Sequence, residues 1–246
     1  MTVMLSLFRE LHQRNRLLSI VGWLHAVGLA IALVLALVDQ RTILGINAWI
    51  KPIKFLSSAA IFLRTVAWLS AYVRKPSRSL TVISWGIAIA MLVENLLIAV
   101  QAGRGLTSHF NESTPLDHMI YAAMGVFILA NTLLIAWLLL LFQRPGRAVD
   151  TVFLWGIRMG LATFIAGSLI GGIMVSNGAH SIGVLDGGAG LPFVNWSTEA
   201  GDLRVSHFVG LHALQILPLA GFLIRPLDAA DLRTKDDAHL ILRRLR

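Results

Sequence analysis

Residues 17–38 read LLSIVGWLHAVGLAIALVLALV, a stretch without Asp, Glu, Lys or Arg. A helix needs about 20 mostly apolar residues to cross a bilayer, so this stretch is long enough to be a membrane span. Five further mostly apolar stretches follow, at residues 52–73, 80–100, 119–142, 152–175 and 208–224. The sequence therefore predicts an all-α integral membrane bundle of six transmembrane helices, in a single transmembrane domain that covers residues 1–246.

The overall composition agrees with a membrane protein. Hydrophobic residues make up 56% of the chain and charged residues 14%, whereas soluble domains carry roughly 25% charged residues. The chain has no cysteine. This absence excludes disulfides, thiolate metal sites and a cysteine nucleophile.

Lys and Arg residues are distributed unequally between the two sides of the predicted bundle. Fourteen of them flank the spans on one side, and five (Arg41, Lys51, Lys54, Arg104 and Arg204) lie on the other. The positive-inside rule places the richer side in the cytoplasm, so both termini are expected there. Residues 228–246 mix leucines with charges and predict a cytoplasmic amphipathic tail. The net charge of +8 is then explained by topology and by attraction to the lipid bilayer, and no nucleic-acid partner is expected.

The connections on the predicted outer side are the longer ones. The longest, residues 176–206, is rich in Gly and carries Trp196. Long connections tend to be functional or disordered, and the apolar side chains of this one can pack. We expect an ordered loop between the fifth and sixth spans that covers the outer face, with Trp196 as its roof.

Polar residues inside the spans are the candidates for chemistry, because charged groups in a membrane are costly and usually face the bundle interior. Glu94 lies in the third span, and Gln101 is seven residues on, which places both on one helical face. Arg104 and His109 follow in the next loop. Glu94, Arg104 and His109 are the predicted catalytic group, and the alternative is a structural ion pair of Glu94 with Lys54 or Arg64.

The histidines suggest a cofactor. A non-covalent haem b needs only imidazole ligands from different helices, and the expected axial pair is His212 with one of His25, His118 and His207. The predicted function is a haem b-binding redox membrane protein whose ligand is a quinone or a lipid-like molecule. The sequence does not determine the oligomeric state, and a protein without any cofactor is a further alternative.

Two other functions compete with this one. In the first, a divalent metal held by His109, His118, His207 and Asp117 serves an enzyme that acts on a lipid or small amphiphile at the outer face. In the second, a binding or transport protein takes up a polar solute or a proton. Lys54, Gln101, Arg204 and Trp196 are the predicted substrate-binding residues.

Two polar segments carry a resemblance. Residues 201–215 read GDLRVSHFVGLHALQ, and residues 104–111 read RGLTSHFN. These segments resemble parts of an uncharacterised family of bacterial polytopic membrane proteins without an assigned function. The resemblance implies a multi-pass protein of the bacterial cytoplasmic (inner) membrane, and it implies no activity.

Overall fold

The computed structural model describes residues 2–74, 77–146 and 149–225, and most of these residues are helical. A first helix, α1 (Thr2–Arg14), precedes six longer ones. The longer helices are α2 (Arg16–Val38), α3 (Ile50–Leu69), α4 (Arg78–Arg104), α5 (Pro115–Leu141), α6 (Thr151–Asn177) and α7 (Leu203–Ile224). A short 3-10 helix, η1 (Ser70–Tyr72), continues α3. Two small hairpins are formed by β1 (Thr42–Ile43) with β2 (Ile46–Asn47) and by β3 (Ser181–Ile182) with β4 (Gly201–Asp202).

Within the described residues, six helices are long and apolar enough to cross a membrane, which is consistent with an integral membrane protein. Each overlaps one predicted span, but every one of the six observed helices begins earlier than its predicted span. Helix α7 begins at Leu203 rather than at residue 208, and α5 begins at Pro115 rather than at residue 119. The difference arises because polar residues cap these helices: Asp202 accepts a hydrogen bond from the N–H of Arg204, and Thr114 accepts one from that of Asp117.

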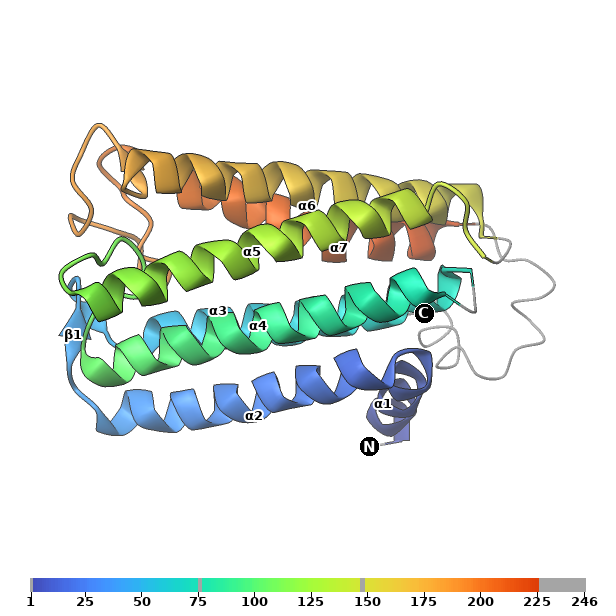
Figure 1. The fold of residues 1–246 in the computed structure, drawn as a ribbon, viewed down its shortest axis with the longest axis horizontal. Helices are drawn as coiled ribbons and strands as arrows, with labels where there is room; N and C mark the ends of the chain where they lie inside the picture. The colour runs from blue at the N-terminus through green and yellow to red at the C-terminus, as the bar shows by residue number, and fades with distance from the viewer. Residues whose placement is uncertain (1, 75–76, 147–148, 226–246) are drawn as a thin grey trace.

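The six long helices run antiparallel to their sequence neighbours, as Figure 1 shows. The closest pairs are α6 with α7, α2 with α3 and α4 with α5. Three connections, residues 39–49, 105–114 and 178–202, lie at one end of the bundle, which we call the loop end. The other end, where α3 finishes and α4 begins, is called the short-turn end. Helix α2 begins at the short-turn end, and α7 ends there.

Glycines bring α6 and α7 into backbone contact. A Cβ atom added to Gly210 would lie 2.5 Å from the Cα of Gly167, and one added to Gly156 would lie 2.6 Å from the carbonyl oxygen of Leu217. Small residues allow the two backbones to approach closely. The hydrophobic effect does not drive helices together within a membrane, so their association depends on close van der Waals packing of this kind. The glycine spacing of α6 therefore serves packing within the chain.

The sequence did not predict α1 as a helix. It crosses the start of α2 at the short-turn end (Figure 1), and Arg14 at its end donates to the carbonyl oxygen of Trp68 at 3.1 Å. Thirteen residues are too few for a span, so a search for apolar stretches of membrane length does not find this helix. The predicted tail at residues 228–246 lies outside the described residues.

Candidate functional site

The connection between α6 and α7 is held by its own hydrogen bonds. Strand β3 pairs with β4, and Gly190 bridges to Ser197 in the antiparallel sense. Asp186 accepts hydrogen bonds from the backbone N–H groups of His180 and Ser181, and its Oδ2 lies 2.6 Å from Nδ1 of the His180 ring. Hydrogen bonds therefore join distant residues of the 178–202 connection to one another.

The charges of this loop are perturbed by their contacts. Burial disfavours ionisation of Asp186, but the hydrogen bonds from His180 and Ser181 outweigh it and lower the pKa of Asp186 to about 2. Burial also lowers the pKa of His180, although Asp186 opposes that shift. The role of Asp186 was not predicted, and a carboxylate six residues after a histidine was too weak a signal to find it.

The loop closes over the ends of α3 and α7. Lys54 of α3 donates to the carbonyl oxygen of Val194 at 3.2 Å, and Arg204 of α7 donates to that of Asn195 at 2.5 Å. The Trp196 ring lies 5.6 Å from that of Phe208, which in turn lies 4.3 Å from His212. Lys54 and Arg204, two of the predicted substrate-binding residues, thus contact the stretch of loop that contains a third, Trp196.

A second polar group lies beside this contact, inside the loop end of the bundle. The ammonium of Lys51 donates to Nδ1 of His109 at 3.1 Å, which leaves the hydrogen of a neutral imidazole on Nε2. That Nε2 atom lies 3.7 Å from Oε1 of Glu94. Burial, together with the charge of Lys51, holds the pKa of His109 well below its usual value. Lys51, His109 and Glu94 therefore form a line from the loop end into the bundle.

Glu94 is buried, with only 2% of its surface accessible to solvent. Its Oε2 atom nevertheless has no hydrogen-bond partner among the described residues. Its neighbour Asn95 and Asn131 of α5 each have a buried side-chain oxygen in the same condition. Buried polar atoms without partners are rare in folded proteins. Each of the three atoms is a hydrogen-bond acceptor, so each can accept a hydrogen bond from a donor such as water, and the Glu94 oxygen can also bind a proton.

Gln101 and Arg104 do not join Glu94. The amide of Gln101 donates to Oδ1 of Asp117 at 2.9 Å, and Arg104 donates to the same oxygen at 2.5 Å. Thr114 donates to the other oxygen at 2.6 Å. These bonds satisfy the buried Asp117 carboxylate and fasten the 105–114 connection between α4 and α5. The arrangement is that of a structural network.

The four histidines predicted to hold haem lie in different surroundings. His25 is buried with Nδ1 2.8 Å from the carbonyl oxygen of Val21 and Nε2 3.2 Å from that of Met91. His212 has Nδ1 3.1 Å from Oε1 of Gln215 and Nε2 3.4 Å from Oγ of Ser58.

The other two differ in exposure. His118 is 61% exposed and faces Glu112 at 3.9 Å. His207 donates from Nδ1 to the carbonyl oxygen of Gly167 at 2.7 Å, a bond that leaves its Nε2 for another partner. His207, which is half-buried, thus has a ring nitrogen without a partner among the described residues, and haem binding by a pair of these four rings stays a prediction.

The predicted metal ligands are also separated. Across the described residues, no group of three or more His, Asp or Glu side chains is placed to hold a metal ion. Asp117 is occupied by Arg104 and Gln101, and His118 lies at the surface. The structure does not bring His109, His118, His207 and Asp117 together.

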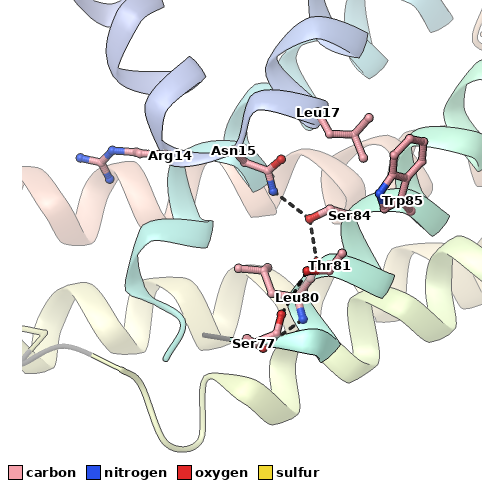
Figure 2. Close-up of a pocket in the computed structure, with 8 residues that line it drawn as sticks. All are labelled: Arg14, Asn15, Leu17, Ser77, Leu80, Thr81, Ser84 and Trp85. Atoms are coloured by element: carbon pink, nitrogen blue, oxygen red, sulfur yellow. Dashed lines mark hydrogen bonds between the residues drawn. The ribbon is translucent and has the colours of Figure 1, made fainter. Parts of the chain in front are cut away.

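A pocket of about 280 Å³ lies far from these groups, at the short-turn end (Figure 2). Its polar side chains bond to one another: Asn15 donates to Ser84 Oγ at 2.8 Å, and Ser84 donates to the carbonyl oxygen of Leu80 at 2.7 Å. Figure 2 shows the Arg14 side chain directed away from this ladder. The hydrogen bond between Asn15 and Ser84 links the start of α2 to α4. The perturbed titratable groups described above lie at the opposite, loop end of the bundle, so this pocket is not the candidate site.

Comparison of this chain with models of protein families, with curated proteins and with solved structures finds no match. The roles of its residues are therefore inferred from geometry and chemistry.

Proposed function

We propose that this protein is a proton-linked binding or transport protein that spans a bacterial cytoplasmic membrane six times. Six helices of membrane length support the multi-pass topology. The excess of Lys and Arg at the short-turn end supports an orientation with both termini in the cytoplasm. In that orientation the loop end faces outward, and the line of Lys51, His109 and Glu94 begins on the outer side.

The observation that carries the proposal is the Glu94 carboxylate. A carboxylate buried in a membrane-spanning helix is costly unless it is paired, and such groups mark ion and proton pathways. The basic side chain that pairs with Glu94 among the described residues is the His109 imidazole at 3.7 Å, which is not a permanent cation. An imidazole can accept a proton on one ring nitrogen and release another from the opposite nitrogen. His109 can therefore relay protons between Lys51 at the loop end and Glu94 in the interior.

Proton flux into vesicles tests this function. Purified protein is placed in liposomes that contain a pH-sensitive dye, and a potassium diffusion potential drives protons inward. We expect the protein to increase the rate of acidification over that of empty liposomes, and the Glu94→Gln variant to remove the increase. Glutamine keeps the shape of the side chain but cannot exchange a proton.

Glu112→Gln is the matched control, because it removes a carboxylate that is 65% exposed at the same end of the bundle. This variant should behave as the wild type does. Wild-type flux equal to that of empty liposomes, or equal flux in the Glu94→Gln and Glu112→Gln variants, would refute the proposal.

Haem b binding is the alternative with one favourable observation: Nε2 of His207 has no partner within the part of the chain that the structure describes. It predicts a Soret absorption band in protein that has been expressed with a supply of haem and purified in detergent. The His207→Leu variant should lose that band. Absence of the band from the wild type would eliminate this alternative.

A further inference from the structure

Three cations share the space between the loop and the bundle. Lys51 and Lys54 of α3 and Arg204 of α7 lie close enough to repel one another. Two carboxylates lie beside them: Asp202 pairs with Arg204 at 2.5 Å, and Glu94 attracts Lys51 across the His109 ring. Lys54 has no carboxylate partner among the described residues.

Lys54 and Arg204 each contact a neutral oxygen of the loop, which Arg204 does in addition to its pair with Asp202. Their partners are the carbonyl oxygens of Val194 and Asn195, which belong to consecutive residues. Two adjacent oxygens facing two cations have the layout in which a carboxylate or phosphate group binds. A carbonyl oxygen carries only a partial charge, so it compensates an ammonium less well than an ionised oxygen does.

The backbone that supplies these carbonyls is strained. Phe193 has φ of +66° and Asn195 has φ of +56°, and both values lie in the left-handed region. Asparagine tolerates this region, but a bulky residue such as phenylalanine is a true outlier there. Strain of this kind is concentrated at ligand clamps and active sites, where the surrounding contacts hold it in place. Here the strain coincides with the two carbonyls that cover Lys54 and Arg204.

We infer that Lys54 and Arg204 form a binding site for an anionic oxygen group, a carboxylate or a phosphate, and that residues 193–195 cover this site in the structure. The anion's oxygens would replace the carbonyls of Val194 and Asn195. The aromatic rings of Trp196 and Phe208 would flank the organic part of the ligand. The inference rests on the proposed function, for which it names the class of solute that accompanies the proton.

Equilibrium binding tests the site without a membrane gradient. The probes are inorganic phosphate and acetate, added to wild-type protein in nanodiscs of phosphatidylcholine and followed by titration calorimetry. We expect at least one of them to bind, and Lys54→Gln to weaken that binding about tenfold or more, since hydrogen bonds between charged groups are stronger than those between neutral groups. Lys54→Arg, which restores the charge, should recover most of the affinity.

Arg41→Gln is the control for a general loss of charge, because Arg41 is a cation at the same end that is 51% exposed and paired with Asp39. This variant should bind as the wild type does. A lipid headgroup is the other source of the same chemistry, and native mass spectrometry of protein from phosphatidylglycerol nanodiscs detects it. Lipid retained by the wild type and lost from Lys54→Gln would assign the site to a headgroup.

The inference is overturned if phosphate, acetate and phosphatidylglycerol all bind the wild type no better than they bind Lys54→Gln. It also fails if Arg41→Gln loses as much affinity as Lys54→Gln. Failure of the proposed function would look different from failure of this inference. If only the proton pathway is wrong, Glu94→Gln leaves vesicle acidification unchanged, but anion binding still depends on Lys54.

Discussion

Replacing Gly210 by alanine should separate α6 from α7. The new Cβ would lie 2.5 Å from the Cα and 3.0 Å from the nitrogen of Gly167, and 3.3 Å from the carbonyl oxygen of Thr163. Carbon atoms in contact normally stand about 3.5–4.0 Å apart, so the closest pair is short by about 1–1.5 Å. All three atoms belong to the backbone, and no side-chain rotation can relieve the overlap. Overpacking of this kind costs about 1–3 kcal/mol.

The expected loss is a decrease in the unfolding free energy of purified protein, measured by denaturant titration in detergent micelles. At about 1.4 kcal/mol per factor of ten, it corresponds to about a 5- to 150-fold change in the folding equilibrium. Gly172→Ala is the matched control, because a Cβ at Gly172 meets nothing within 4 Å. Alanine favours helix over glycine, so this variant should be as stable as the wild type or more so. Equal stability of the Gly210→Ala and Gly172→Ala variants would refute close backbone packing as the basis of the α6–α7 contact.

Two further predictions concern the titratable groups of the loop end. The pKa of His109 in the folded state lies below the usual value of 6.5, so as the pH falls the unfolded chain binds this proton first. Stability should therefore be complete above about pH 6.5 and decrease below it, and denaturant titrations at several pH values should show a smaller decrease for His109→Gln; an equal decrease would contradict the assignment. Replacing Asp186 by asparagine removes the charged acceptor for the N–H groups of His180 and Ser181. Hydrogen–deuterium exchange at these two amides should become faster while exchange in α6 stays unchanged, and protected amides in the variant would show that other contacts hold the loop.

The candidate site was predicted in part. Sequence reasoning selected Glu94, His109, Lys54 and Arg204, and the structure gathers these residues at the loop end. The sequence did not predict a role in the site for Lys51, whose ammonium contacts His109. The available signal was the Lys51-Pro-Ile-Lys54 spacing, which places both lysines on one helical face. Charge counting used Lys51 only as a marker of topology, because nothing local in the sequence indicates which element will face it.

The sequence by itself determined the six long helices, because each must supply about 20 apolar residues and such stretches are visible without knowledge of their neighbours. It also determined that Glu94 and Gln101 share a face of α4, because helical periodicity is a local property. The tertiary structure alone decided their partners. Gln101 contacts Asp117 of α5, whereas Glu94 faces His109 of the 105–114 connection, which follows α4 and folds back over the end of the bundle. Periodicity states which way a side chain points along its own helix, and only packing between helices states what it meets.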